Sequence, residues 1–187
     1  MTNTTILAPK ASYAKTSANE NSIPDAEVGF RNYIVVLNEK SGSANLPDLR
    51  SFMEERAKTL GKNIQFIELK KDLDLDIALQ NMASVNDTEV YIAAGGDGTL
   101  AAVAHYARQH NKIFAVIPCG TANVFAKEHS IPGNVKDAAE LALTGDRVCP
   151  VDVLDIGGKT YLCHISIGTY SWITLHTNAE SKRKYGR

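Results

Sequence analysis

The sequence lacks a long hydrophobic run and an excess of charge of one sign. Among its 187 residues, the longest apolar runs, such as 33–37, are far shorter than the roughly 20 residues that a membrane-spanning helix needs. Its 20 Lys and Arg residues nearly balance 21 Asp and Glu residues, for a formal charge of -1. These absences exclude a membrane span, and they predict no nucleic-acid partner because a surplus of cations is what neutralises phosphates.

The sequence also has few cysteines and no secretory signal. Cys119, Cys149 and Cys163 are odd in number and far apart, unlike metal sites or disulfide scaffolds, so they predict reduced thiols in a cytoplasmic protein that is at most peripheral at a membrane. Residues 1–30 are rich in Thr, Ser, Asn, Ala and Lys. This composition predicts a disordered tail over 1–30; a transit peptide is the less favoured alternative.

Apolar segments typical of strands alternate with segments typical of helices over residues 31–147. The run 33–37 is continuous and β-branched, which suits a strand buried on both faces. The pattern predicts strands at 33–37, 64–69, 89–94 and 112–117, and helices at 46–60, 75–82, 99–109, 123–128 and 135–143. We therefore expect a doubly wound α/β nucleotide-binding domain with a parallel sheet.

The pattern changes behind Gly145. Segments 148–156 and 159–167 flank Gly157-Gly158, a two-residue signal for a hairpin turn. This predicts that a second, β-rich unit begins at 148 and continues, incomplete, to 187, because so few strands do not close a sandwich or barrel.

The strongest candidate site follows the strand predicted at 89–94 and opens a helix. It reads Gly95-Gly96-Asp97-Gly98-Thr99. Glycines let the backbone approach a phosphate closely, and free amides at a helix N-terminus favour an anion. A carboxylate beside phosphates implies a cation, so Asp97 is expected to hold Mg²⁺. The alternative is a tight turn in which Asp97 caps the helix.

Two further loops follow other predicted strands, at the edge where open α/β sheets bind ligands. One is Pro118-Cys119-Gly120-Thr121-Ala122-Asn123, whose hydroxyl and amide suit a phosphate or a ribose; alternatively, Thr121 or Asn123 caps the next helix. The other contains Asn38 with Ser41-Gly42.

Taken together and in this order, the three loops resemble the catalytic domain of the diacylglycerol kinase family, which includes bacterial lipid kinases and sphingosine kinases. The resemblance implies transfer of the γ-phosphate of Mg-ATP to a lipid hydroxyl at a membrane surface, with diacylglycerol or a sphingoid-like lipid as acceptor. It implies that 95–99 cradle the phosphates, that Thr121 contacts nucleotide, and that Asn38 lies beside the adenine or ribose. The nucleotide-binding residues expected on this basis are Asn38, Ser41, Gly42, Gly95, Gly96, Asp97, Gly98, Thr99, Gly120, Thr121 and Asn123.

The sequence departs from the family pattern at two places. Leu100-Ala101 stands where many members have Asn-Glu, and Val124 stands where Asp is common, so contacts made by those groups are missing. The resemblance also implies that the general base acting on the lipid hydroxyl lies outside this sequence, leaving Asp97 as the one catalytic candidate. We therefore expect the nucleotide-binding half of a lipid kinase; the alternatives are a NAD kinase-like enzyme and a non-catalytic nucleotide-binding fragment. Exposed strand edges in the incomplete β-rich unit predict a homodimer or poor solubility.

Overall fold

A computed structural model of the chain describes residues 2–7, 29–38, 46–70, 73–83 and 88–163. Within these residues, seven strands form a sheet in the order β3-β2-β4-β5-β1-β6-β7. The strands are β1 (Thr2–Leu7), β2 (Asn32–Leu37), β3 (Asn63–Glu68), β4 (Val90–Gly95), β5 (Ile113–Pro118), β6 (Val148–Ile156) and β7 (Lys159–Tyr161). The helices are α1 (Leu46–Thr59), α2 (Leu75–Ala83), α3 (Asp97–Gln109), α4 (Val124–Glu128) and α5 (Val135–Thr144).

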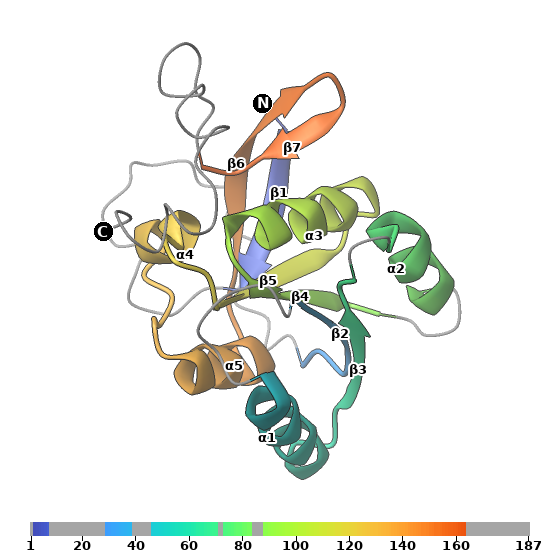
Figure 1. Cartoon of the computed structure of the whole chain (residues 1–187), viewed down its shortest axis with the longest axis vertical. Helices are drawn as coiled ribbons and strands as arrows, with labels where there is room; N and C mark the ends of the chain where they lie inside the picture. Colours follow the sequence, from blue (N-terminus) through green and yellow to red (C-terminus); the bar gives the residue numbers. More distant parts are fainter. Residues whose placement is uncertain (1, 8–28, 39–45, 71–72, 84–87, 164–187) are drawn as a thin grey trace.

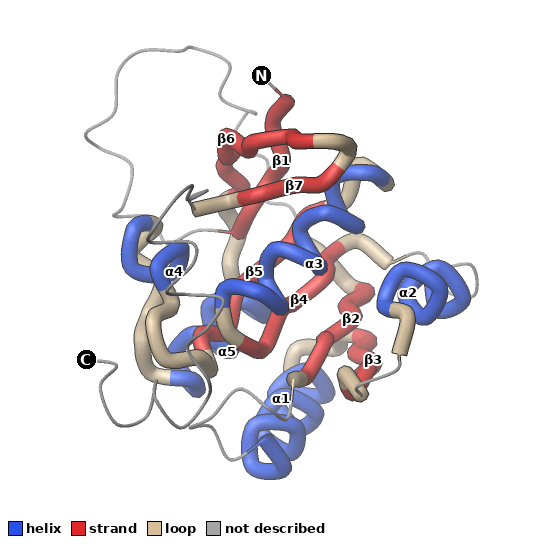
Figure 2. Tube along the Cα trace, turned by 45° about the horizontal axis from the view of Figure 1, so that its top comes forward, coloured by secondary structure: helices blue, strands red, loops and turns tan. Residues whose placement is uncertain are grey.

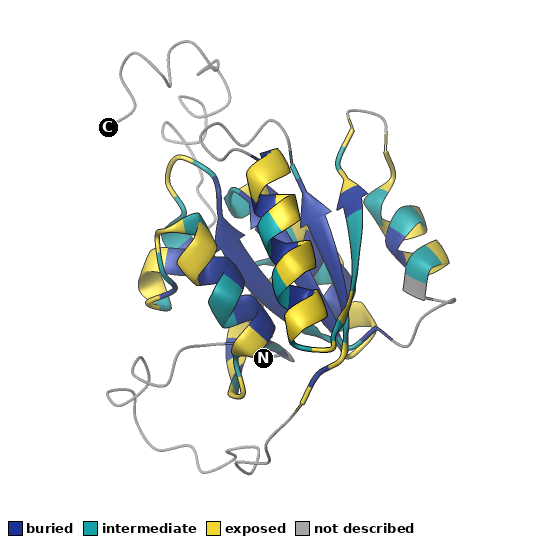
Figure 3. Cartoon of the chain, turned by 90° about the horizontal axis from the view of Figure 1, so that it is seen from below, coloured by how far each residue is buried: buried dark blue, intermediate teal, exposed yellow. Residues whose placement is uncertain are grey.

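The five strands from β3 to β1 run parallel, and β6 and β7 continue the sheet antiparallel. Every residue of β4 is buried, as are five of the six residues of β2 and of β5. Continuous apolar strands of this kind are typical of parallel sheets whose two faces are both covered. Figure 3 shows these buried strands at the centre, with the exposed residues on the outer sides of the helices.

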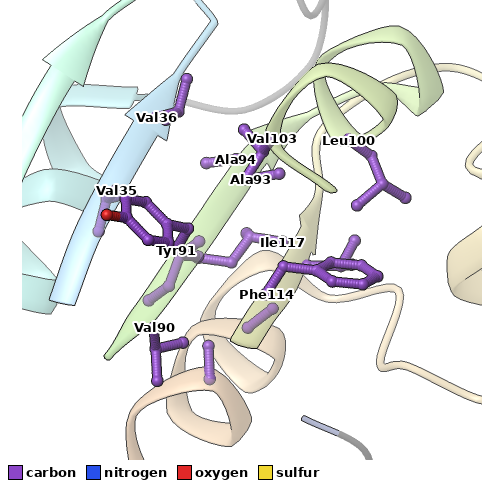
Figure 4. Packing of buried hydrophobic residues seen from close by; sticks show 14 of the residues in the cluster. Val35, Val36, Val90, Tyr91, Ala93, Ala94, Leu100, Val103, Phe114 and Ile117 are labelled. Atoms are coloured by element: carbon purple, nitrogen blue, oxygen red, sulfur yellow. The ribbon is translucent and has the colours of Figure 1, made fainter. Parts of the chain in front are cut away.

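Helices cover both faces of the sheet (Figure 1). On one face α1 packs beside α5, and the guanidinium of Arg56 makes a bidentate ion pair with Glu140. On the other face α3 packs on β4, with Leu100 and Val103 beside Ala93 and Ala94 (Figure 4). The doubly wound α/β fold expected from the sequence is confirmed.

The structure corrects the expected disordered tail at its beginning. Thr2–Leu7 forms β1, which lies between β5 and β6 in the sheet, with Ile6 and Leu7 fully buried. The segment is rich in β-branched residues, which favour strands, and pairing on both sides satisfies its backbone. The remainder of the expected tail, 8–28, lies outside the described residues.

The predicted hairpin turns at Gly157 and Gly158, which both have positive φ. Its second strand ends at Tyr161, earlier than the predicted 159–167, because 162–163 form a bend; 164–167 lie outside the described residues. The hairpin lies beside α3 (Figure 2). The buried hydroxyl of Thr160 contacts Nδ1 of His105 at 3.0 Å and accepts a hydrogen bond from Arg108 at 2.9 Å. Because β6 pairs with β1, it extends the α/β sheet; the division into domains at 147 and 148 stays a prediction.

Among the described helices, none has the length and apolar character needed to cross a membrane.

Candidate functional site

The carboxyl ends of three neighbouring strands meet at one edge of the sheet. Leu37 of β2 pairs with Ala94 of β4, and Ala94 in turn pairs with Ile117 of β5. The chain leaves β2 toward α1 and β3 on one side, whereas it leaves β4 toward α3 and β5 on the other. This reversal is a topological switch point, the place where open α/β sheets bind ligands.

The glycines of the loop after β4 have different surroundings. Gly95 is buried beneath the side chain of Thr99, and a β-carbon at Gly95 would lie 2.5 Å from Thr99 Oγ1. Gly96 occupies the N-cap position of α3, and no side chain caps this helix. Gly98 is exposed, with open space around its Cα. The first amides of α3 are therefore presented at the switch point without a capping side chain.

Asn38 joins the end of β2 to this loop. Its backbone N–H donates to the carbonyl oxygen of Ala94 at 3.0 Å, and its side-chain Nδ2 donates to Thr99 Oγ1 at 2.8 Å. The structure thus brings Asn38 and 95–99 together, as expected from the sequence. Ser41 and Gly42 of the same predicted loop lie outside the described residues.

The loop after β5 packs directly on the loop after β4. The N–H of Cys119 donates to the carbonyl oxygen of Gly95 at 2.9 Å. A β-carbon at Gly120 would lie 2.6 Å from the Cα of Gly96, far inside ordinary contact distance. Only glycine at position 120 allows the two loops to approach this closely.

The side chain of Asn123 locks the second loop in shape. Asn123 has a left-handed backbone conformation, with φ of 47°. Its Oδ1 accepts from the N–H of Gly120 at 3.0 Å, and its Nδ2 donates to the carbonyl oxygen of Gly120 at 2.8 Å. Asn123 stands at the N-cap position of α4, yet its side chain makes no capping bond. Thr121 is exposed at the tip of the loop.

Asp97 lies in α3, but its side chain contacts α4, the helix that follows the loop after β5. Its Oδ1 accepts a hydrogen bond from the N–H of Phe125, in the first turn of α4, at 3.4 Å. Gly96, and not Asp97, is the N-cap of α3, so the simple helix cap considered for Asp97 is not the arrangement found. Instead, the carboxylate of Asp97 accepts from the first turn of α4, and this bond connects the loop after β4 with the loop after β5.

The environment of Asp97 includes residues that sequence reasoning missed. Burial, followed by the negative charges of Asp97 and Glu128, raises the pKa of the Cys163 thiol, which also interacts with the backbone of Phe125. A lone cysteine after a hairpin gives no sequence signal for such a position. Burial alone raises the pKa of the Cys119 thiol to about 11, which makes Cys119 an interior side chain and a poor nucleophile.

A small hollow lies at this junction. It is lined by Gly95, Gly96, Asp97, Leu100, Val116, Pro118, Asn123 and Ala126. Its accessible volume of about 10 Å³ is close to that of one water molecule. The hollow is therefore too small to hold a ligand between the two glycine loops. Within the described part of the chain, no group of three or more His, Cys, Asp or Glu side chains could hold a metal ion.

The sequence model of the diacylglycerol kinase catalytic domain matches residues 32–156, which include β2 to β6 and all three loops. The chain belongs to the diacylglycerol kinase catalytic domain family. A protein of Cronobacter sakazakii named "Probable lipid kinase YegS-like" is 32% identical over 109 residues, and a protein of the same name from Pseudomonas aeruginosa is 38% identical over 97 residues.

A solved structure shares the fold of this diacylglycerol kinase family member. The crystal structure of a diacylglycerol kinase from Bacillus anthracis str. Sterne matches with a TM-score of 0.60 and 27% identity, over 71% of this chain and 46% of that chain. The matches with the Cronobacter and Pseudomonas proteins cover 56% and 51% of this chain, and 36% and 32% of those proteins. The chain thus spans only part of the length of its relatives.

Proposed function

We propose that this chain is the nucleotide-binding part of an ATP-dependent lipid kinase. The observation that carries the proposal is the contact between Gly96 and Gly120 at the switch point, beside Asp97 and the uncapped N-terminus of α3. Side chains are absent where a phosphate must meet the backbone, and the helix dipole favours an anion there. Membership of the diacylglycerol kinase catalytic domain family supports the same function.

Each loop contributes a different part of the proposed site. The amides of 96–99 bind the phosphates, and the carboxylate of Asp97 holds Mg²⁺ against them. A single carboxylate is enough for this assignment, because Mg²⁺ bound to a nucleotide takes one or two protein carboxylates, with phosphate oxygens and water completing its shell. Mg-ATP supplies the phosphoryl group, and its transfer depends mainly on position and charge neutralisation.

The remaining site residues hold or extend this surface. Asn38 lies beside the ribose or adenine while its Nδ2 fixes Thr99 beneath the phosphate loop. The two hydrogen bonds between Asn123 and Gly120 hold the loop after β5 in its conformation against the loop after β4. Thr121, which is exposed in the same loop, contacts the nucleotide. Leu100, where many family members have Asn, is buried and lines the hollow below, so it offers no polar contact to a ligand.

The proposed acceptor is a lipid hydroxyl met at a membrane surface from the cytoplasmic side. Its test is transfer of label from γ-labelled ATP to diacylglycerol or sphingosine in detergent micelles, with NAD as a parallel acceptor, by a form of the protein that also carries the general base for the lipid hydroxyl. We expect labelled lipid, with transfer lost in Asp97→Asn. The matched control is Asp152→Asn, because Asp152 is an exposed carboxylate on β6. Labelled NAD without labelled lipid would contradict the proposal in favour of a NAD kinase-like enzyme.

A further inference from the structure

The strand β1 lies inside the sheet, between β5 and β6, although it comes from outside the part of the chain that the family model matches (Figure 1). Both of its neighbours, β5 and β6, lie within that part. The family segment therefore supplies two strand edges that face each other, and a segment from elsewhere in the sequence fills the space between them. The two facing edges are called the β5–β6 site below.

The composition of β1 suits an edge strand better than an interior strand. Its sequence is Thr-Asn-Thr-Thr-Ile-Leu, with branched aliphatic residues only at the last two positions. Strands inside a sheet that is covered on both faces are usually apolar throughout, and every residue of β4 is buried in this way. Only Ile6 and Leu7 give β1 large aliphatic side chains to bury in the sheet.

The pairing of β1 with its two neighbours is uneven. Every residue from Thr2 to Leu7 pairs with β6, in the antiparallel direction. The parallel pairing with β5 is confined to Thr5 and Ile6. The contact with β5 thus contains a short ladder, so β1 can separate from β5 without the loss of many backbone hydrogen bonds.

The fit of β1 in the β5–β6 site is imperfect at Thr4. This residue is 3% exposed, and its Oγ1 is buried without a hydrogen-bond partner among the described residues. Thr4 lies opposite Val151, which is also buried. A buried hydroxyl that makes no hydrogen bond loses its hydration without compensation, so it weakens the binding of the strand. An aliphatic side chain of the same shape would fit this position better.

We propose that the β5–β6 site binds an extended peptide by pairing with it on both sides, and that β1 is its resident and replaceable ligand. The register defines the specificity, because Ile6 lies opposite Phe114 of β5 and Cys149 of β6, and both are buried. The preferred peptide carries branched aliphatic side chains at the positions of Thr4 and Ile6, which share one face of the strand. Main-chain hydrogen bonds provide the affinity of such strand addition, and alternate side chains provide its specificity.

Release of β1 leaves the hairpin attached to the molecule by side chains. Within the described sheet, β6 pairs with β1 and β7 alone, so β1 is the backbone connection between the hairpin and the parallel strands. The ion pair between Arg108 of α3 and Asp155 of β6, at 2.7 Å, and the hydrogen bond from Arg108 to Thr160 do not involve β1. The hairpin can therefore stay on α3 while one strand replaces another. The inference goes beyond the proposed function, since it uses none of the nucleotide-site residues.

Hydrogen exchange in the wild-type chain tests whether β1 leaves the sheet by itself. We expect the hydrogen-bonded amides of β1 to exchange through a local opening, about tenfold faster or more than those of β4. Low concentrations of denaturant should change the exchange of β1 only slightly, because a local opening exposes little surface. Exchange of β1 and β4 at one common rate, with the same dependence on denaturant, would show that β1 leaves only when the whole chain unfolds. That result would overturn the proposal.

A synthetic peptide with the sequence of residues 1–8 tests the site itself in the full wild-type chain. The peptide carries Ile6→Cys, activated as a mixed disulfide with thionitrobenzoate. Directly paired antiparallel residues have Cα atoms about 4.5–5.5 Å apart, a separation that suits a disulfide. In the site, the thiolate of Cys149 attacks the peptide sulfur and releases thionitrobenzoate. The matched control peptide carries Thr5→Cys instead, which pairs with Pro150 and lies on the opposite face.

Mass spectrometry of the digested chain then identifies the labelled cysteine. We expect the Ile6→Cys peptide to label Cys149 about tenfold faster or more than the Thr5→Cys peptide does, and an excess of the unmodified peptide to slow this labelling. Adding Thr4→Val to the Ile6→Cys peptide should lower the concentration for half-maximal labelling by about tenfold, because it removes the unpaired hydroxyl. No labelling, labelling confined to Cys119 or Cys163, or equal labelling by the two peptides would overturn the proposal.

Discussion

Gly96 and Gly120 approach each other so closely that a β-carbon at Gly120 would lie 2.6 Å from the Cα of Gly96 and 2.9 Å from Asn123 Oδ1. The two glycines come from loops that follow different strands, β4 and β5. Their contact fixes how close the two loops of the proposed phosphate site lie, because any side chain between the glycines would push the loops apart. The proposed function depends on this distance.

The substitution Gly120→Ala is expected to separate the two loops and to weaken nucleotide binding. Neither the backbone of Gly96 nor the locked amide of Asn123 can move aside cheaply, so overpacking should cost about 1–3 kcal/mol of stability. Chemical denaturation measures this cost, and Gly133→Ala is the control because a β-carbon there meets nothing within 4 Å. Equal stability of the two variants would show that the loops are not in contact in solution.

The hydrogen bond between Asn38 and Thr99 is expected to couple β2 to the start of α3. Asn38→Ala, Thr99→Val and the double variant form a thermodynamic cycle, and the coupling energy should be about 1 kcal/mol, as for a typical hydrogen bond between side chains. Denaturant titrations of the four proteins provide the measurement. Additive effects would mean that the 2.8 Å contact contributes nothing in solution.

Stability is expected to fall at alkaline pH. Burial raises the pKa of Cys119 from 9.0 to about 11, so the unfolded chain loses this proton first as the pH rises. The contribution of the neutral thiol is therefore complete below pH 9 and is lost progressively between pH 9 and about pH 11. Denaturation at pH 7 and pH 10 should show a smaller decrease in Cys119→Ala than in the wild-type chain. An identical decrease would contradict the assignment.

Thr160 is expected to hold the hairpin against α3. Its buried hydroxyl serves both His105 and Arg108, so Thr160→Val leaves two polar side chains without this partner at a cost of about 1–3 kcal/mol. Amide hydrogen exchange should become faster in β7 than in β4. Thr144→Val is a suitable control, because Thr144 is exposed and its hydroxyl bonds only within its own helix. Unchanged exchange in β7 would argue against the contact.

Most of the α/β pattern could be predicted from the sequence, because glycines and polar loops separate continuous apolar strands. The predicted helix at 46–60 is α1, which begins at the same residue and ends at Thr59, and the hairpin turns where Gly157-Gly158 predicts. The strand β1 could not be predicted in this way. It has few apolar residues, and its neighbours β5 and β6 lie more than a hundred residues further along the chain.

The sequence likewise indicates which residues gather at the proposed site, but not how they contact one another. Strand register places Asn38, Gly95 and Pro118 at one edge, as the alternation of strands and helices implies. The contact of Asp97 with Phe125 and the lock between Asn123 and Gly120 depend on loop geometry, and composition does not encode such geometry. The position of Cys163 near Asp97 depends on how the hairpin packs, which local sequence does not reveal.

Calorimetric titration with Mg-ATP tests the central claim most directly. The account predicts saturable binding by the folded chain that requires Mg²⁺ and is lost in Asp97→Asn, whereas Asp152→Asn binds as the wild-type chain does. The isosteric change keeps an acceptor for the N–H of Phe125, so a loss reports the charge of Asp97 and not the packing of α4. Binding that is unchanged in Asp97→Asn, or that proceeds equally without the metal, would contradict the account.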